Sequence, residues 1–364
     1  MPSLDPLQRP PDAVRDVYKK YQRMKRVDLD SDHGIVHLER SLDLDVELPH
    51  LREQSSSSRM GKASIVDILE REQLNATFRS FAGSFTDDES SKPVPVYEHE
   101  NMPGLHIIPN LLPPEIQTIL LSRLLHRDLS CPSHLTNIHT HYDLKYPSPE
   151  SSFFSFPPIS SIPLADPLDP SVHRPLDISS LLNRKIRWMT LGGQYDWTEK
   201  RYPKSLPPDF PQDLKDMLQS LFPGTKAEAA IVNLYSPGDT LSVHRDVAEE
   251  CGKGLISVSL GCDAIFVIGT SPPSQLTNAK LDSQSGNLPE EDPPKILTIR
   301  LGSGSVVYMS GASRFAWHGV PQIVPDTCPD YLKNWPAGAD GEFEQWRGWM
   351  SKKRVNLNVR QMRN

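Results

Sequence analysis

Prolines interrupt this chain along its whole length. The 364 residues include 35 prolines, roughly twice the share found in an average protein. Because proline lacks a backbone N–H and breaks the interior of a helix, long helices have little room here. Short strands joined by many loops tolerate such a sequence better. The prolines therefore disfavour a helical bundle and favour a mainly β fold.

Short apolar stretches separated by turn residues occupy the second half of the chain. The strands we expect cover residues 229–235, 240–244, 255–260, 264–268, 296–301, 305–309 and 354–361. Many short strands with turns such as Pro237-Gly238 between them are typical of a β-sandwich or a jelly roll. We therefore predict a jelly-roll core with flanking helices.

The first hundred residues differ from the rest of the chain in composition and in the spacing of their apolar residues. Residues 12–27 have the apolar spacing of an amphipathic helix, and residues 63–81 predict a second helix. Polar stretches around 55–58 and 87–95 predict linkers. We interpret residues 1–100 as an N-terminal extension that is partly helical and partly disordered.

Residues 101–364 form the predicted globular domain. It opens with a strand at 104–108 and a helix from Pro113 to about Leu125. A stretch at about 131–182 is rich in proline and serine and predicts a poorly ordered surface insertion. Residues 271–294 lack apolar periodicity and predict a loop between two strands.

The composition bears on whether the chain is a membrane protein, a secreted protein, a zinc protein or a nucleic-acid-binding protein. The apolar runs are strand-length, and residues 1–26 contain no apolar stretch, so we expect a soluble intracellular protein without a membrane partner. We also expect a monomer. Nucleus, cytoplasm and mitochondrion all remain open as its compartment. The four cysteines form no C-x-x-C pair and no zinc spacing. The net charge of −7 neither favours nor excludes a nucleic-acid partner.

Three residues have the chemistry of a metal site. His244 and Asp246 lie two apart at the end of an expected strand, so both side chains can reach one ion. A surface ion pair would explain this pair equally simply. His318 lies 72 residues after Asp246, and by itself it could be an ordinary core histidine. Two imidazoles and one carboxylate would leave three open positions on an octahedral ion, as in non-haem Fe(II) oxygenases.

The last strand alternates strictly between polar and apolar residues. Arg354, Asn356, Asn358 and Arg360 share one face, and three aliphatic residues share the other. The pattern suits a half-exposed strand. If the polar face instead lines a barrel, its two guanidinium groups need anionic partners, which a small dicarboxylate would supply. On another strand Asn233 and Tyr235 share a face and could donate hydrogen bonds to the same ligand.

These residues belong to an ordered set of motifs over residues 229–364. The set comprises Asn233-x-Tyr235-x-x-Gly238, His244-x-Asp246, Ser257 to Gly261, Ala264 to Phe266, Ser313-Arg314 with His318, and Arg354-x-Asn356-x-x-x-Arg360-Gln361. It resembles the AlkB family of Fe(II)- and 2-oxoglutarate-dependent dioxygenases. The resemblance implies a double-stranded β-helix, which is a form of jelly roll. It also implies that Fe(II) is held by the catalytic residues His244, Asp246 and His318. The cosubstrates would be 2-oxoglutarate and O₂, with 2-oxoglutarate held by Arg354 and assisted by Asn233, Tyr235, Asn356 and Arg360.

A second segment indicates which subfamily of the AlkB family the chain resembles. Residues 190–197, followed by Lys200, Arg201 and Tyr202, are similar to the nucleotide-recognition segment of the first eukaryotic AlkB homologue, and we place this segment at about 184–225. Trp188, Tyr195 and Trp197 are candidates for stacking on a base beside a basic cluster that includes Arg201. Without the resemblance, core aromatic residues and solvated cations would be the simpler interpretation.

One position departs from the family pattern. Repair-type AlkB proteins carry an acidic residue two positions after the metal-binding aspartate, where this chain has Ala248. Glu249 is the nearest substitute and becomes a candidate substrate residue. The base selectivity of the repair enzymes therefore does not transfer to this chain.

The resemblance implies oxidative demethylation of N-methylated bases in RNA or DNA, with tRNA favoured, and release of formaldehyde, succinate and CO₂. Two alternatives stay open. The same site could act on a protein or a small molecule, because fold and cofactor do not determine the substrate. The chain could also be a non-catalytic scaffold that binds nucleic acid.

Overall fold

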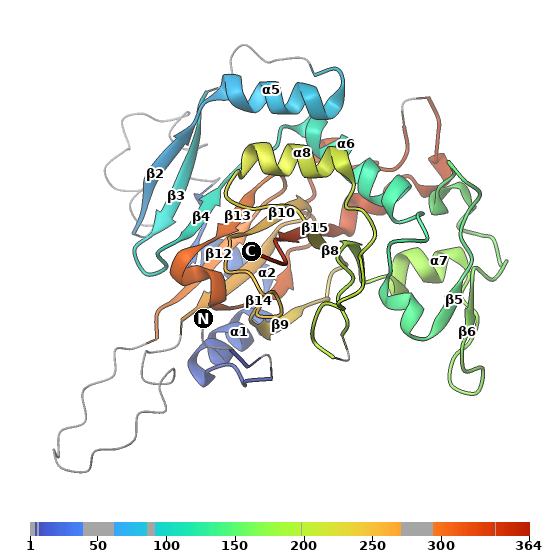
Figure 1. Cartoon of the computed structure of the whole chain (residues 1–364), viewed down its shortest axis with the longest axis horizontal. Helices are drawn as coiled ribbons and strands as arrows, with labels where there is room; N and C mark the ends of the chain where they lie inside the picture. Colours follow the sequence, from blue (N-terminus) through green and yellow to red (C-terminus); the bar gives the residue numbers. More distant parts are fainter. Residues whose placement is uncertain are drawn as a thin grey trace.

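The computed structural model describes residues 4–5, 7–38, 62–85, 92–197, 199–270, 294–338 and 340–364. Within these ranges two β-sheets pack against each other, with helices on the outer side of each (Figure 1). The mainly β fold with flanking helices is thereby confirmed. Across the described ranges, no helix has both the length and the apolar character needed to cross a membrane.

The larger sheet has eight antiparallel strands. Their spatial order is β2 (Ala63–Leu69), β3 (Val94–His99), β4 (Leu105–Ile108), β13 (Val306–Met309), β10 (Leu255–Gly261), β15 (Arg354–Arg360), β8 (Ala229–Tyr235) and β7 (Trp188–Gly192). The sheet places β15 between β10 and β8. The boundary predicted at residue 100 falls between β3 and β4, which pair with each other, so one sheet contains both sides of it.

The smaller sheet has five strands. Their order is β1 (Ile35–Val36), β12 (Ile296–Leu301), β11 (Ala264–Gly269), β14 (Trp317–Ile323) and β9 (Leu241–His244). All seven strands predicted after residue 228 are present in the two sheets. The sequence pattern misses β14 because Gly319 and Pro321 suggest a turn. Pro321 is accommodated where the register between β11 and β14 shifts.

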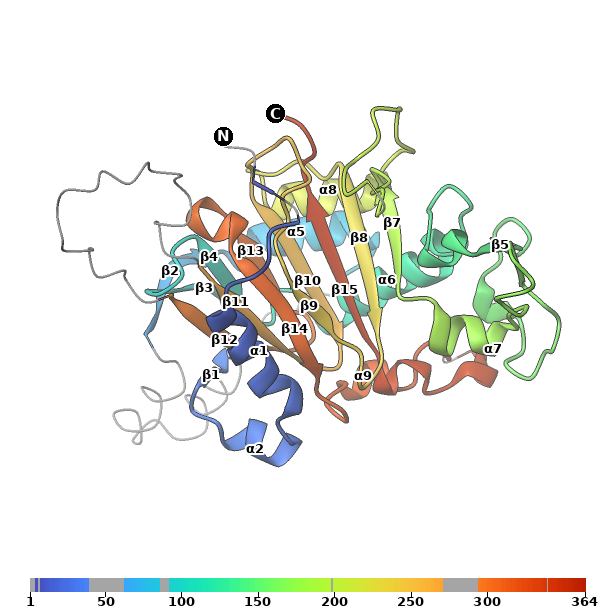
Figure 2. The same ribbon diagram turned by 90° about the horizontal axis from the view of Figure 1, so that it is seen from below.

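Helices cover the outer faces of both sheets. The helices are α1 (Asp12–Arg23), α2 (Arg26–Ser31), α5 (Arg71–Ala82), α6 (Pro114–Ser122), α7 (Ile178–Ser180), α8 (Gln212–Leu221) and α9 (Asp330–Lys333). Helices α5, α6 and α8 lie over the eight-stranded sheet, and α1 lies below β9 and β14 (Figure 1). Helix α2 packs against the five-stranded sheet through Leu29. A two-stranded hairpin of β5 (Tyr142–Leu144) and β6 (Ala165–Pro167) stands apart from the sheets, as Figure 2 shows.

The strand β15 illustrates how the core is divided. Val355, Leu357 and Val359 are fully buried and belong to the main hydrophobic cluster, which also includes residues of α5, α6 and α8. The other side of β15 faces the smaller sheet, because the Arg354 guanidinium donates a hydrogen bond to the Leu301 carbonyl of β12. The predicted alternation therefore separates an apolar outer face from a polar interior between the sheets.

The N-terminal helix is part of this packing. Helix α1 begins at Asp12, as predicted, but ends at Arg23 because Met24 adopts an extended backbone. Its residues Val14 and Tyr21 are buried in a second apolar cluster with Trp317 of β14. The helix thus gains its order from the five-stranded sheet.

The helix predicted over 63–81 is wrong for its first half. Residues Ala63–Leu69 form the edge strand β2, and the helix α5 starts only at Arg71. The β-branched residues Ile65, Val66 and Ile68 favour an extended backbone, and pairing with β3 stabilises it. The apolar residues in this stretch are compatible with the spacing of a helix or of a strand. Pairing with β3 therefore determines that the stretch is a strand.

The insertion at 131–182 is not poorly ordered, contrary to the prediction. Phe153 and Phe154 are fully buried, and the Phe154 ring lies 5.1 Å from the rings of both Trp335 and Trp349. The Trp346 indole also donates a hydrogen bond of 2.9 Å to the Phe156 carbonyl. Aromatic residues from a distant part of the chain therefore order a segment that its composition alone presents as a loop. The predicted linker at 55–58, residues 271–293 of the predicted loop and part of 87–95 lie outside the described residues.

Candidate metal centre and substrate site

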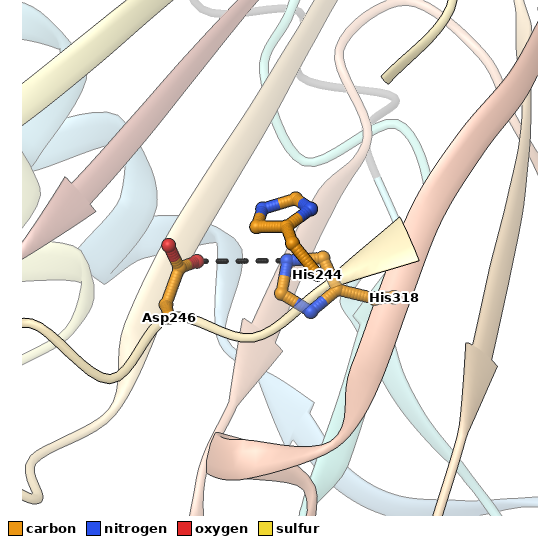
Figure 3. Close-up of side chains that lie close together, drawn as sticks. All are labelled: His244, Asp246 and His318. Carbon is orange, nitrogen blue, oxygen red and sulfur yellow. Dashed lines mark ion pairs between the residues drawn. The ribbon is translucent and has the colours of Figure 1, made fainter. Parts of the chain in front are cut away.

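The three predicted metal ligands converge between the sheets. His244 ends β9, His318 lies opposite it on β14, and Asp246 follows in the loop after β9. One ligand atom from each lies within 4.8 Å of the others, and the two imidazole centroids are 4.5 Å apart (Figure 3). Antiparallel pairing thus brings together residues separated by 74 positions.

Backbone carbonyls select the tautomer of both histidines. The Nδ1 atom of His244 lies 2.9 Å from the Ser242 carbonyl, and that of His318 lies 3.0 Å from the Ala316 carbonyl. Because a carbonyl only accepts, each Nδ1 carries the hydrogen and each Nε2 keeps a free lone pair. Burial and the neighbouring His318 lower the pKa of His244 to about 4, so its ring is neutral near pH 7.

Asp246 supplies the negative charge. Burial alone would raise its pKa, but Arg360 and the two histidines outweigh burial and hold the pKa well below its usual range. Its Oδ2 atom lies 3.5 Å from His318 Nε2 and has no hydrogen-bond partner among the described residues. Two imidazoles and one buried carboxylate oxygen without a partner are a suitable donor set for a ferrous ion.

The predicted cosubstrate residues form two adjacent rows on the inner face of the larger sheet. Arg354 of β15 lies directly opposite Tyr235 of β8, and Asn356 lies opposite Asn233. Side chains at paired positions point to the same face of a sheet. The structure therefore brings these four residues together, as the sequence predicts.

Arg354 is buried and firmly oriented. Its Nη1 donates to the Cys262 carbonyl at 3.1 Å and its Nη2 to the Ser259 hydroxyl at 2.7 Å. The Tyr235 hydroxyl is also buried and has no hydrogen-bond partner within the described ranges, and burial raises its pKa. A buried phenol without a partner beside a buried guanidinium suits a carboxylate ligand, because both groups donate to anions.

Arg360 lies at the other end of β15. Its Nη1 atom is 3.3 Å from Asp246 Oδ1 and 3.1 Å from Glu249 Oε1. At about 3.3 Å per residue, the backbones of Arg354 and Arg360 are roughly 20 Å apart. Arg360 therefore contacts the candidate metal ligand, whereas Arg354 belongs to the opposite end of the site.

The predicted stacking residues form one aromatic cluster. The Trp197 ring lies 5.0 Å from Trp188 and 4.8 Å from Tyr195, and Tyr195 lies 5.4 Å from Tyr202. Trp188 of β7 pairs with Asn233, so the cluster adjoins the cosubstrate row. The indole of Trp197 is 46% exposed, which leaves an aromatic surface open to a ligand.

A pocket of about 600 Å³ adjoins this cluster and the loop after Asp246. Its lining residues are Asp196, Arg201, Tyr202, Pro203, Lys204, Ala248, Glu250, Met362 and Arg363. Of the predicted substrate residues, Arg201 is among them. Glu249, which we predicted to contact substrate, is not among them, and its side chain is only 1% exposed.

Comparison with known proteins identifies the family. The profile of the 2OG-Fe(II) oxygenase superfamily matches residues 104–360. The chain belongs to this superfamily. It is also 42% identical to the N6-methyladenosine RNA demethylase ALKB1 of Pyricularia oryzae, over 99% of this chain and 98% of that protein. This oxygenase is therefore an AlkB homologue, as the motifs indicate.

Two other relatives agree with this assignment. An N6-methyladenosine RNA demethylase ALKBH of Cryphonectria parasitica is 50% identical over 62% of this chain and 99% of that protein. The tRNA demethylase abh1 of Schizosaccharomyces pombe is 39% identical over 74% of this chain and 82% of that protein. The solved structure of OsALKBH1 covers 71% of this chain and 97% of its own chain, with 18% identity and a TM-score of 0.43, too low a similarity for a comparison of the two sites.

Two residues of this oxygenase site are absent from the predicted set. Arg314 is fully buried and contacts Glu249 and the backbone of Asp246. The hydroxyl of Tyr202, in the aromatic cluster, is buried, and burial raises the pKa of Tyr202 although the positive charge of Arg360 opposes the change. Arg314 belongs to the Ser313-Arg314 motif that precedes His318, but the motif assigns it no role, and its partners are visible only in the folded chain.

Proposed function

We propose that this AlkB homologue oxidatively removes methyl groups from N-methylated bases in RNA, preferably in single-stranded or looped regions such as those of tRNA. The proposal rests on the convergent ligand atoms of His244, Asp246 and His318 beside the buried Arg354 and Tyr235. This juxtaposition of a metal centre and an anion site is what a ferrous oxygenase using 2-oxoglutarate requires.

Each residue has a separate task in this proposal. When bound, Fe(II), 2-oxoglutarate and O₂ supply the oxidation of an N-methyl group, which leaves as formaldehyde while the cosubstrate becomes succinate and CO₂. His244, Asp246 and His318 would hold the ion. Arg354 and Tyr235 would bind the distal carboxylate of 2-oxoglutarate, with the amides of Asn233 and Asn356 beside it.

Features outside the metal centre support a nucleic-acid substrate. The pocket carries the cations Arg201, Lys204 and Arg363, which suit a phosphate backbone. The aromatic cluster with exposed Trp197 suits stacking on an unpaired base. The three relatives described above are named for RNA or tRNA demethylation. A base already outside a duplex avoids an unstacking cost of a few kcal/mol, so we favour RNA loops over duplex DNA.

The decisive experiment measures formaldehyde and succinate released by the full chain with Fe(II) and 2-oxoglutarate. The substrates are N6-methyladenosine in an RNA stem-loop, a methylated tRNA and N6-methyladenine in a DNA duplex. We expect equimolar formaldehyde and succinate, with faster turnover on RNA. Unmethylated versions of the three oligonucleotides are the matched controls.

The remaining outcomes distinguish the alternatives. Faster turnover on the DNA duplex would contradict the RNA preference. Succinate release without demethylation of any oligonucleotide would favour a protein or small-molecule substrate. Tight binding of oligonucleotides without 2-oxoglutarate turnover would favour a non-catalytic scaffold. The monomeric state and the intracellular compartment expected from the sequence stay predictions.

A further inference from the structure

We propose that Glu249 is a positioning residue of the metal centre rather than a substrate contact. It holds two buried arginines, Arg314 and Arg360, which in turn hold the backbone and the side chain of Asp246. The inference rests on the proposed function, in which Asp246 is a metal ligand.

The contacts form a closed ring. Glu249 Oε1 lies 3.1 Å from Arg360 Nη1, and this same nitrogen lies 3.3 Å from Asp246 Oδ1. On the other side, Arg314 Nη2 donates to Glu249 Oε2 at 3.0 Å, and Arg314 Nη1 donates to the Asp246 carbonyl at 2.8 Å. Glu249 therefore reaches Asp246 by two independent routes.

The ring is buried and its charges balance. The side chains of Glu249 and Arg314 are 1% exposed, and those of Arg360 and Asp246 are 3% and 9% exposed. Buried charges are tolerated only when partners compensate them, and here two carboxylates face two guanidiniums. Both oxygens of Glu249 are engaged within the protein. A base in the adjoining pocket would therefore have to compete with two arginines for this carboxylate.

The ring also determines which oxygen Asp246 presents. Arg360 occupies Oδ1, whereas Oδ2 faces His318 Nε2 at 3.5 Å without a hydrogen bond. A third hydrogen bond of Arg314, from Nε to the Lys253 carbonyl at 2.8 Å, anchors the far end of the same loop. The arrangement keeps Asp246 in place before any ion binds, which is how partners behind a metal ligand raise affinity.

Loss of the Glu249 charge would upset this arrangement. Asp246 would then be the only carboxylate left in the ring to balance two buried guanidiniums, and Arg360, which already contacts Asp246 Oδ1, would compete with a divalent cation for it. The excess positive charge would also lie close to the bound ion. We therefore expect weaker metal binding, even though Glu249 touches no metal.

The test uses Co(II) as the probe and the full chain without nucleic acid. Glu249→Gln keeps the size of the side chain but removes its charge. We expect its Co(II) dissociation constant from isothermal titration to rise at least tenfold, together with a changed visible spectrum of the bound Co(II). Glu115→Gln is the matched control, because it removes an exposed carboxylate of helix α6, outside both the metal centre and the pocket, and should change Co(II) affinity less than twofold.

A second variant keeps the test valid if Glu249→Gln does not fold. Arg314→Lys retains the charge but cannot bridge Glu249 and the Asp246 carbonyl together, so it should weaken Co(II) binding in the same direction. Unchanged Co(II) affinity and spectrum in a folded variant would overturn the inference, even if its melting temperature fell. Unchanged Co(II) affinity with an altered choice of methylated base would assign Glu249 to substrate contact. Failure of the wild-type chain to bind Co(II) would instead contradict the proposed metal centre.

Discussion

Asp246 and the two histidines are held in different ways, and the difference has a chemical consequence. Backbone carbonyls orient both imidazoles, so these ligands depend only on their own strands and turns. Asp246 depends on side chains from elsewhere, namely Arg360 of β15 and Arg314, which lies just before β14. The carboxylate is therefore the ligand most sensitive to substitutions at distant positions.

Asp246→Ala removes the only anionic ligand of the candidate centre. We expect Fe(II) or Co(II) binding to fall at least a hundredfold, and formaldehyde release to become undetectable, because two neutral imidazoles cannot balance the charge of a divalent ion. Titration calorimetry and product assay of the purified variant measure both. Asp209→Ala, at an exposed carboxylate, is the control and should behave like the wild type. Full activity of Asp246→Ala would contradict the assignment.

Arg354→Lys tests the cosubstrate site. Lysine keeps the positive charge but loses the planar fork that grips a carboxylate in bidentate fashion. We expect the dissociation constant for 2-oxoglutarate to rise about tenfold, a loss of about 1.4 kcal/mol, whereas affinity for an RNA stem-loop changes less than twofold. Calorimetry with each ligand on the same preparation measures both quantities. An equal loss of both would mean that Arg354 supports the fold as a whole.

At the scale of elements, the ordered insertion depends on a few aromatic contacts. Phe154 packs edge-on against Trp335, Trp346 and Trp349, which come from a segment almost two hundred residues later. These contacts tie the insertion to the 3₁₀ turns that precede β15. The insertion therefore contributes to stability in a way that its proline and serine content conceals.

Phe154→Ala should destabilise the protein by about 3–5 kcal/mol, because the fully buried ring leaves a cavity that rigid tryptophans cannot fill. Urea unfolding followed by tryptophan fluorescence measures the change. Ile159→Ala in the same insertion is the control, since Ile159 is 93% exposed. It should change the free energy of unfolding by less than about 0.5 kcal/mol. Equal effects would mean that the insertion is not packed as described.

The π-helix Arg123–Asp128 makes stability depend on pH. His126 in this helix stacks on Phe343, with ring centroids 4.4 Å apart, and burial lowers its pKa to about 4. In the unfolded chain the pKa is about 6.5, so between these values the unfolded state binds more protons. The stabilisation is therefore complete above about pH 6.5 and is lost as the pH falls toward 4.

Because of His126, the free energy of unfolding should fall by about 2 kcal/mol when the pH falls from 7.5 to 5. His126→Phe removes the titrating group and keeps an aromatic ring. The free energy of unfolding of this variant should therefore fall less over the same pH interval, by about 2 kcal/mol. Urea unfolding of both proteins at the two pH values measures the difference. The same pH dependence in both proteins would show that His126 is not responsible.

At the scale of the whole molecule, the substrate face is assembled from distant parts of the chain. The aromatic cluster comes from residues 188–202, the metal loop from residues 244–253, and the C-terminal Met362 and Arg363 complete the pocket. The chain as a whole is acidic, with a net charge of −7. Any attraction for phosphate must therefore come from the local cations of this face rather than from bulk charge.

Trp197→Ala tests whether this face receives the base. We expect demethylation of a methylated RNA stem-loop to fall about tenfold, because one stacking interaction is lost. Turnover of 2-oxoglutarate without RNA should stay within twofold, since Trp197 is not placed in the metal centre. Leu206→Ala, at a 94% exposed side chain of the same segment, is the control. A parallel fall of both activities would mean that Trp197 supports the fold instead.

Local patterns in the sequence predicted seven of the strands after residue 228 and the residues of the candidate site, but not β14 or the edge strand β2. Alternation in residues 354–360 and the two-residue step from His244 to Asp246 are local patterns, which a strand converts directly into shared faces. The order of the motifs identified the family. These predictions needed no knowledge of which segments pack together.

The partners of the buried charges are set by long-range packing. Glu249 is surrounded by Arg314 and Arg360, which lie 65 and 111 positions away in the chain, and no local pattern specifies such a contact. The same holds for the insertion, whose Phe154 gains its order from tryptophans far along the chain. Burial and ion pairing depend on which distant segments meet, because desolvation is set by the packed surroundings and not by neighbours in sequence.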